Sequence, residues 1–316
     1  MTPQELERHQ QYITGSKVAS IIGLPDAFVS KYTLFSCMRG RTAWPEDVNK
    51  QDLFLAGQCA ELAMSEYCRL KWGWDLRPGP PGGMFHPRYP FIYGLADRLR
   101  MGKGGLDQII EFKNVGEWAR SEWENGPPQK YIAQCVLYTL IYDLPATIVC
   151  CIGGSDYQVF PIDRDAKIEN FILTECIQFW QDLQAGNWPA PDGHETTTAT
   201  IREQFQTHSA EMIHADSDFI AAAVQYEQGR RLEKQGKGQK EEAGNKLKAR
   251  IGHALGGEFW GGSATWKETK PKIMQFDGDR FQADHPDLFK KYQKLPDPTR
   301  VLRVTVREGV LNQYAK

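Results

Sequence analysis

The sequence predicts an α/β (α+β) fold with a mixed central sheet flanked by helices. Amphipathic helical patterns and short β-branched or aromatic runs follow one another in the order helix, strand, strand, helix, strand, strand, helix. A segment rich in Pro, Gly and Thr over 187–200 buries little and is typical of a boundary. We therefore expect a first domain over 1–190, a linker over 191–208 and a C-terminal region over 209–316. The 316 residues are sufficient for two such parts.

Each element of the first domain has a local signal. Thr14 is a favourable N-cap for a short helix that stops at Gly23. Residues 51–71 carry apolar side chains three and four positions apart, as an amphipathic helix does. Residues 90–100 and 106–113 are predicted to pair as an antiparallel hairpin. The remaining predicted elements are a helix over 127–143, two paired strands over 146–154 and 156–162, and an amphipathic helix over 165–184.

The C-terminal region has a different composition. Two helices over 209–228 and 240–255 are predicted to form a helical hairpin, and 262–307 to form a small β-rich region. The segment 229–250, which overlaps the second of these helices, contains eight basic and three acidic residues. This pattern fits a solvated helical pair, and it also fits a DNA-tracking arm or a surface for a partner protein.

Composition excludes several classes of protein. The chain carries 38 basic and 40 acidic residues, so its formal charge of -2 does not by itself favour a nucleic-acid partner. No apolar run approaches the roughly 18 residues of a membrane-spanning helix, and the polar N-terminus does not resemble a secretory signal. Seven scattered cysteines are typical of a reducing compartment, so we expect a cytoplasmic protein without membrane attachment.

The predicted hairpin carries the candidate catalytic residues. Glu111 and Lys113 are two apart on the second strand, so they project to one face while Phe112 points to the other. Asp97 on the first strand is brought alongside them. Two carboxylates and a lysine suit metal-assisted phosphodiester hydrolysis, because hard oxygen ligands hold Mg²⁺ or Mn²⁺ and the ammonium stabilises the transition state. The same loose pattern also occurs on ordinary solvated strand faces.

Three flanking features favour the catalytic interpretation. Glu61 lies at the border of the polar face of the 51–71 helix, where it can reach a metal through water. Tyr131 and Gln134 are three apart on the helix after the hairpin and can face one site. Arg8 and the segment 13–16 (ITGS) place a cation, two hydroxyls and a helix N-terminus close together, as a terminal phosphate requires. Each feature also has a structural interpretation as a surface charge, a helix residue or a cap.

These motifs together resemble those of the YqaJ/lambda-exonuclease family of phage-type recombination nucleases, a branch of the PD-(D/E)XK superfamily. The resemblance covers roughly residues 5–190 and rests on five motifs in order: R-x(7)-S with ITGS, G-x-x-x-E at 57–61, A-D-R at 96–98, I-I-E-F-K-N at 109–114, and P-x-x-Y-x-x-Q at 128–134. It implies a restriction-endonuclease-like core and a processive 5′→3′ exonuclease. Such an enzyme degrades the 5′-ended strand of double-stranded DNA to expose a 3′ overhang for recombination or repair. It also implies Mg²⁺ as cofactor, a toroidal homotrimer and a single-strand-annealing partner protein.

The resemblance also implies roles for individual residues. Asp97 and Glu111 resemble the metal ligands, with the backbone carbonyl of Phe112 as a third ligand. Lys113 resembles the catalytic lysine. The further residues carried over are Gln134 and Glu61 in the catalytic site, and Arg8, Thr14, Ser16 and Tyr131 in the 5′-phosphate site. The family's usual Pro-Asp is replaced here by Ala96-Asp97.

Other interpretations remain open at this point. Arg39 and Arg41 are candidates for guiding duplex DNA through phosphate contacts, or form a solvated basic turn. A restriction-type endonuclease of the same fold differs only in requiring no free DNA end. A non-catalytic DNA-binding or assembly protein could keep the fold without the chemistry.

Overall fold

The computed structural model describes residues 3–44, 50–268, 276–294 and 300–313. The chain forms two compact units, Met1–Phe205 and Gln206–Lys316. The seven cysteines all lie in the described ranges and are free thiols. Among the described helices, none combines the length and the apolar character needed to cross a bilayer.

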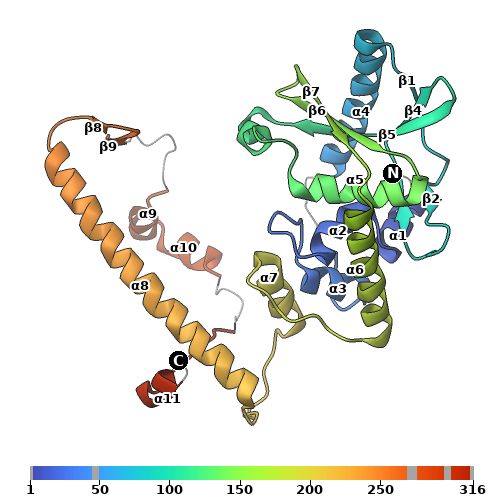
Figure 1. Ribbon diagram of the computed structural model, residues 1–316. Coiled ribbons are helices and arrows are strands. Elements are labelled where there is room, and N and C mark those ends of the chain that lie inside the picture. The colour runs from blue at the N-terminus through green and yellow to red at the C-terminus, as the bar shows by residue number, and fades with distance from the viewer. Residues whose placement is uncertain (1–2, 45–49, 269–275, 295–299, 314–316) are drawn as a thin grey trace. The chain divides into compact units, whose positions relative to one another are not determined.

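A five-stranded mixed sheet forms the centre of the first unit (Figure 1). Its strand order is β1-β4-β5-β6-β7, and only the β5–β6 pair is parallel. The strands are β1 (Asp75–Arg77), β4 (Arg98–Gly102), β5 (Gly105–Val115), β6 (Ala146–Ile152) and β7 (Asp156–Ile162). A separate antiparallel pair consists of β2 (Met84–Phe85) and β3 (Tyr93–Gly94). The predicted mixed sheet is thereby confirmed.

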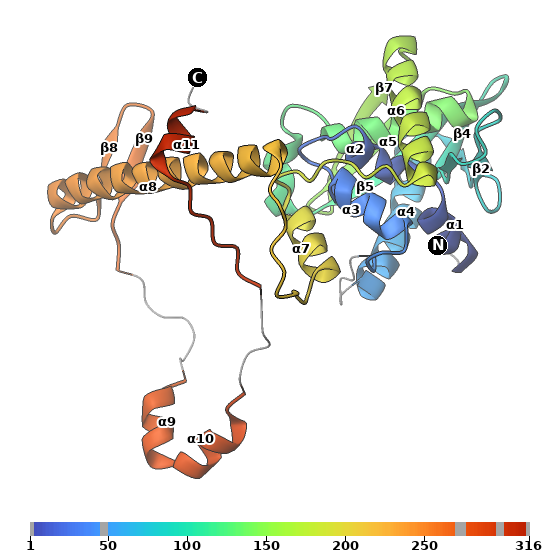
Figure 2. The ribbon, with the colours of Figure 1, turned by 90° about the horizontal axis from the view of Figure 1, so that it is seen from below.

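Helices cover both faces of this sheet, as the alternating residues of β5 require. On one face, Phe112 packs with Met64 and Cys68 of α4 (Lys50–Trp72). On the other face, Ile109 belongs to the main core with α2 (Gly15–Ile21), α5 (Gln129–Tyr142) and α6 (Ala166–Ala185), which lie together in Figure 2. The other helices of this unit are α1 (Pro3–Gln11), α3 (Lys31–Met38), the 3-10 helix η1 (Glu117–Trp123) and α7 (Glu195–Gln204). The helix, strand-pair and helix elements predicted over 1–190 are therefore present.

The predicted strand over 90–100 is not continuous. It consists of β3 and β4, separated by a bend that contains Asp97. The β4–β5 ladder ends where Arg98 lies opposite Ile110. Beyond that point the carboxylate of Asp97, rather than a backbone carbonyl, accepts the N–H of Phe112. A side chain thus replaces the next ladder hydrogen bond, which brings Asp97 to the end of the strand.

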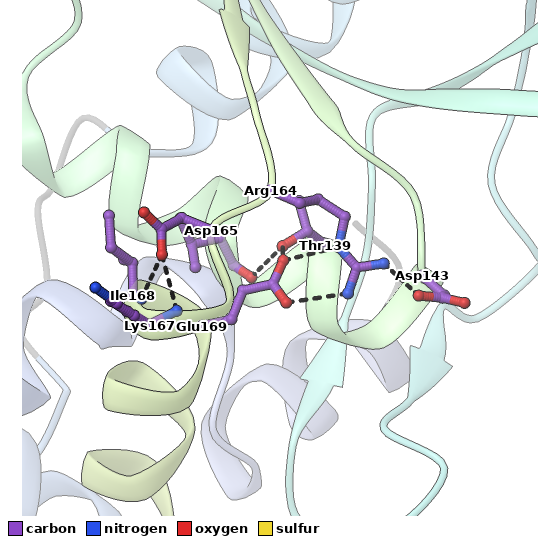
Figure 3. Close-up of polar contacts among 8 residues, drawn as sticks. Thr139, Asp143, Arg164, Asp165, Lys167, Ile168 and Glu169 are labelled. Atoms are coloured by element: carbon purple, nitrogen blue, oxygen red, sulfur yellow. Dashed lines mark hydrogen bonds and ion pairs between the residues drawn. The ribbon is translucent and has the colours of Figure 1, made fainter.

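A polar cluster with a buried glutamate at its centre joins the end of α5 to the beginning of α6 (Figure 3). Glu169 is 7% exposed and accepts from Arg164 Nε at 2.8 Å and from Thr139 Oγ1 at 3.0 Å. Arg164 also bonds Asp143, the left-handed residue that ends α5. Asp165 caps α6 through the N–H groups of its first turn. Because the buried Glu169 carboxylate is paired with Arg164 and hydrogen-bonded by Thr139, this cluster fixes the beginning of α6 against α5.

The predicted linker over 191–208 contains a folded helix, α7, and this part of the prediction is wrong. Its threonines bond the hydroxyls of α3 and its cap: Thr197 Oγ1 donates to Ser30 over 2.6 Å, and Thr200 and Thr33 lie 2.9 Å apart. Hydroxyl side chains that can bond a neighbouring helix allow a Thr-rich segment to pack, although the segment contains little apolar surface.

The second unit contains one long helix where a helical hairpin was predicted. Helix α8 (Ser217–Ile251) runs through the basic segment 229–250 without a turn. Ion pairs from Glu227 to Arg230 and Arg231 support it at helical spacing, and its glycines are flanked by good helix formers. The unit also contains the hairpin β8 (Gly256–Phe259) and β9 (Gly262–Thr265), and the helices α9 (Gly278–Asp284), α10 (Pro286–Tyr292) and α11 (Glu308–Gln313).

The β-rich prediction for 262–307 is wrong over most of its described residues. Only β9 is a strand there, while 278–284 and 286–292 are helical and 300–306 carry no regular structure. The β-branched run near 301–306 is short and has no partner strand in the described part of the chain, so its local preference is not realised.

Candidate active site

Glu111 is the centre of a hydrogen-bonded cluster between β5 and α5. Its side chain is 3% exposed, and Oε1 accepts from Lys113 Nζ at 2.6 Å and from Gln134 Nε2 at 2.7 Å. Lys113 also lies 3.4 Å from Gln134 Oε1, and Gln134 Nε2 donates to Tyr138 Oη at 3.1 Å. Glu111, Lys113, Gln134 and Tyr138 therefore form one hydrogen-bonded network. Both N–H groups of the Gln134 amide are used in it.

Asp97 joins this cluster through the backbone. The N–H of Phe112 donates to Asp97 Oδ2 over 2.8 Å, so the carboxylate lies beside the strand that carries Glu111. The carbonyl of a strand residue points to the same side as its N–H, and the β4 ladder has already ended here. The Phe112 carbonyl is therefore directed toward the side on which Asp97 lies, as the predicted third ligand requires.

One oxygen of the cluster has no partner. Glu111 Oε2 is buried and accepts no hydrogen bond, which is costly for a carboxylate oxygen away from water. Within the described ranges, no group of three or more His, Cys, Asp or Glu side chains is arranged to hold a metal. A set of two carboxylates and one backbone carbonyl nevertheless suits Mg²⁺, which uses one or two carboxylates and keeps several waters. The residues present fit that ion, and the orphaned oxygen is the position it would satisfy.

Electrostatics in the cluster favour a bound cation. Burial, followed by repulsion from Glu111, raises the pKa of Asp97 well above its usual value. Burial lowers the pKa of Lys113, but the Glu111 and Asp97 carboxylates outweigh this effect and the net pKa is raised. The two carboxylates therefore favour the protonated form of Lys113. A further positive charge would relieve the repulsion between the two carboxylates.

Glu61 approaches the cluster from α4. It lines a cavity of about 240 Å³ together with Phe112, Lys113 and Asn114 of β5 and apolar residues of α4. Burial and the charge of Glu111 raise the pKa of Glu61. Glu61, predicted at the border of the polar face of its helix, therefore faces the end of β5.

Two sets of contacts hold the ITGS segment in place. Ile13 pairs with Ile92, through its N–H to Phe91 and its carbonyl to Tyr93. Gly15 packs so closely on α5 that an added Cβ would lie 2.7 Å from Gln134 Cγ and 2.9 Å from Tyr138 Cε1. A glycine is therefore required by space at this position, and it brings the beginning of α2 against the helix that holds Gln134.

The two hydroxyls of ITGS lie together with a histidine from α1. Ser16 Oγ is 2.9 Å from His9 Nε2 and 3.3 Å from Thr14 Oγ1. Lys17 is 3% exposed, and its ammonium donates to the carbonyls of His9, Gln10 and Tyr12 at the end of α1. These contacts hold α1 against the beginning of α2. Thr14 precedes α2 as predicted, but its side chain makes no capping hydrogen bond.

The side chains of two of the three predicted arginines, Arg8 and Arg39, bind backbone carbonyls. Arg8 Nη1 donates to the Gly82 carbonyl at 2.6 Å, and Arg8 Cζ lies 6.0 Å from the centre of the Phe85 ring. Arg39 Nη1 donates to the Leu183 carbonyl in the last turn of α6 at 3.2 Å, and Arg41 is exposed. The described contacts connect neither Arg39 nor Arg41 to the carboxylate cluster.

Tyr131 lies beside the lysine of the cluster. The Lys113 ammonium is 4.7 Å from the centre of the Tyr131 ring, and the buried Trp123 stacks near the same ring at 5.6 Å. The predicted pair of Tyr131 and Gln134 on one helix face is therefore found at the same lysine.

Sequence reasoning missed three residues that position this site. They are Gly15, His9 and Tyr138. Gly15 lies inside a quoted motif, and a glycine at the first helical position was the available signal. His9 lies on α1 and contacts Ser16 of the next helix, and Tyr138 lies one turn after Gln134 on α5. Neither carried a distinguishing pattern in the sequence.

Comparison with solved structures finds similar chains. The chain resembles an alkaline exonuclease. This enzyme, LHK-Exo from Laribacter hongkongensis, is 20% identical at a TM-score of 0.47, and the match covers 58% of this chain and 94% of that chain. Its complex with dAMP gives 20% identity and a TM-score of 0.45 over 57% and 91% of the two chains. SSO0001 is 13% identical at a TM-score of 0.32, over 58% of this chain and 83% of that one. The sequence matches no model of a protein family and no curated protein.

Proposed function

We propose that this chain is a member of the YqaJ/lambda-exonuclease family and a metal-dependent 5′→3′ exodeoxyribonuclease. It would degrade the 5′-ended strand of double-stranded DNA and leave 3′ overhangs for recombination or repair. One observation carries the proposal: Asp97, Glu111, Lys113 and Gln134 form one cluster with a buried carboxylate oxygen that has no protein partner. A hard divalent cation would bind the two carboxylates, and a phosphodiester would bind the cation and the lysine.

Each residue has a distinct task in this proposal. Asp97, Glu111 and the Phe112 carbonyl hold Mg²⁺, or Mn²⁺ in its place, and the ion supplies positive charge that stabilises the phosphoryl transition state. Lys113 gives two of its three N–H bonds to Glu111 and Gln134, so one remains for a phosphate oxygen. Gln134 orients the Glu111 carboxylate by hydrogen bonding it. Glu61 lines the adjoining cavity and is available to a water there.

The ITGS segment supports an exonuclease over an endonuclease. Gly15 packs on Gln134 of the cluster, and the residues on either side of it, Thr14 and Ser16, carry hydroxyls 3.3 Å apart. A pair of hydroxyls beside a helix N-terminus is a group that binds anions. We infer that Thr14 and Ser16 bind the terminal 5′-phosphate, with Arg8 and Tyr131 contributing charge and an aromatic wall. An enzyme that reads a terminal phosphate requires a free DNA end, whereas a restriction-type endonuclease does not.

The decisive assay compares linear, nicked and closed-circular DNA with 5′-phosphate or 5′-hydroxyl ends, in Mg²⁺ and in chelator. We expect cleavage of linear duplex only with Mg²⁺, and labelled ends should show loss of the 5′-ended strand. Glu111→Gln should lower the rate by at least roughly 10²-fold and leave DNA binding intact. Cleavage of closed circles would favour the endonuclease, and activity retained by Glu111→Gln would contradict the metal assignment.

Ser16→Ala tests the terminal-phosphate site separately. The rate on 5′-phosphorylated ends should fall toward the rate on 5′-hydroxyl ends, because the variant loses the hydroxyl but keeps the fold of α2. Ser155→Ala in the turn between β6 and β7 is a matched control outside the cluster. An equal loss on both kinds of end would place the terminal-phosphate site elsewhere.

The remaining family properties belong to the same proposal. We propose a cytoplasmic enzyme of a bacterium or of a phage-infected cell, a homo-oligomer such as a ring trimer, and a single-strand-annealing protein as partner. Arg39 and Arg41 remain candidates for guiding duplex DNA. Co-purification with the annealing protein, and mass measured by light scattering, test the partner and the oligomer independently of catalysis.

A further inference from the structure

A row of alternating cations and aromatic rings leads away from the catalytic cluster. The Lys113 ammonium lies 4.7 Å from the centre of the Tyr131 ring. On the same ring, the Lys130 ammonium lies 5.2 Å from the centre, and it is 4.7 Å from the Phe28 ring. The Phe28 and Tyr131 rings are 6.3 Å apart and tilted. Phe28 and Lys130 have no role in the function proposed above.

The row is held in place by protein contacts at its inner end and left open at its outer end. Asp26, two residues before Phe28, accepts the backbone N–H of Lys130 at 3.1 Å and so ties the α2–α3 loop to the first turn of α5. Trp123, which is 3% exposed, braces Tyr131. Phe28 keeps 54% of its surface exposed. The loop that carries the exposed Phe28 ring is therefore attached to α5 close to that ring.

The charge of Lys130 is not neutralised by an acidic side chain. In the described ranges no carboxylate forms an ion pair with it, whereas Lys113 is paired with Glu111. A cation beside an exposed ring is the arrangement that binds single-stranded nucleic acid, because the ring stacks on a base and the cation contacts the neighbouring phosphate. The row also begins at the lysine that faces the scissile phosphate in the proposed reaction.

We propose that Phe28 and Lys130 form a binding site for an unpaired nucleotide next to the scissile phosphate. The base stacks on Phe28 without sequence preference, and Lys130 contacts the adjoining phosphate. This inference rests on the proposed nuclease function. It adds a stacking side chain and a phosphate contact outside the carboxylate cluster.

The test uses the full chain carrying Asp97→Asn, in chelator, so that binding is measured without cleavage. The probe is a single-stranded oligonucleotide with 2-aminopurine at one of its first three 5′ positions, whose fluorescence is quenched by stacking. Phe28→Ala should weaken binding by roughly 5- to 100-fold and restore the fluorescence at one position. Phe28→Trp should keep both affinity and quenching.

Matched controls come from α6 of the same unit. Phe171 is 53% exposed, so Phe171→Ala removes a comparable exposed ring and should leave affinity unchanged. Lys130→Gln should reduce the salt dependence of binding by about one charge, and Lys167→Gln should not. Circular dichroism of each variant verifies folding.

Two outcomes separate this inference from the proposed function. If the unsubstituted chain cleaves linear duplex but Phe28→Ala binds and quenches like its parent, the nucleotide site is overturned and the nuclease stands. If Phe28→Ala loses quenching while the unsubstituted chain cleaves no DNA, the site stands as a binding surface and the nuclease function fails. Equal losses in Phe28→Ala and Phe171→Ala would also overturn the site.

Discussion

Gln134 Nε2 donates to Glu111 Oε1 across 2.7 Å, although the two residues are 23 positions apart. This bond joins α5 to β5 and leaves the other carboxylate oxygen, Oε2, as the unsatisfied one. The carboxylate therefore has one face occupied by protein donors and one available to a cation. The orientation of Glu111 is fixed before any ligand binds, which is the preorganisation that a catalytic metal site requires.

Mg²⁺ should stabilise the first unit through Asp97. At a concentration ten times Kd, a ligand that binds only the folded state contributes about 1.4 kcal/mol, which raises Tm by about 3–6 °C. Asp97→Asn should abolish this shift while its amide oxygen still accepts the Phe112 N–H. Asp107→Asn, which alters a partly exposed carboxylate paired with Arg100, is the control that should keep the shift. Thermal unfolding with Mg²⁺ and with chelator measures both; an undiminished shift in Asp97→Asn would contradict the assignment.

Gln134→Met should lower metal affinity or kcat while a side chain of similar size keeps the space filled. The Glu111 carboxylate would lose one of its two donors, so we expect metal affinity or kcat to fall about 10- to 100-fold. Tyr138→Phe removes only an acceptor for Gln134 and should have a smaller effect. Titration of Mg²⁺ by activity, with kcat and the metal Kd fitted separately, distinguishes the two variants. Equal effects would show that the bond to Glu111 is not the important one.

Gly15→Ala should disturb the catalytic cluster from a distance in sequence. The added methyl group would lie 2.7 Å from Gln134 Cγ, so either α2 or Gln134 must move. We expect a loss of about 1–3 kcal/mol in the free energy of unfolding, together with reduced activity. Gly104→Ala, where a Cβ meets nothing within 4 Å, is the matched control. Urea unfolding and initial rates check the pair; a neutral Gly15→Ala would refute the close contact.

The stability of the α1–α2 contact should fall in acid because of His9. Burial, followed by the Lys17 ammonium, lowers the pKa of His9 from 6.5 to about 4. Between these values the unfolded chain binds a proton that the folded chain does not, so stability is lost as the pH falls from 6.5 toward 4. The loss reaches about 3 kcal/mol. His9→Gln can still bond Ser16 but does not titrate.

Comparing His9→Gln with the unsubstituted chain measures the contribution of His9 to the loss of stability in acid. Chemical unfolding at pH 7 and at pH 4.5 should show a smaller acid loss for His9→Gln than for the unsubstituted chain. Identical losses would mean that other groups, rather than His9, dominate acid destabilisation of this unit.

Local patterns in the sequence predicted most of the helices and strands over 1–190, and Asp97, Glu111, Lys113 and Gln134 of the cluster. The alternation of strand side chains alone predicts that Glu111 and Lys113 share a face and that Phe112 takes the other. Spacing on α5 likewise predicts that Tyr131 and Gln134 face one site. These predictions succeeded because strand and helix periods fix side-chain directions over a few residues.

Tertiary structure decided what depends on distant segments. The contact of Gly15 with Gln134, the replacement of a ladder bond by Asp97, and the packing of α7 on α3 join residues that no local period relates. The helical hairpin predicted around 229–250 is one helix, because glycine and charge lower helix preference without preventing i,i+4 pairing. The sequence by itself thus specified which chemical groups the site contains. The fold decided which oxygen of Glu111 is left for a cation, because hydrogen bonds from α5 and β5 occupy the other.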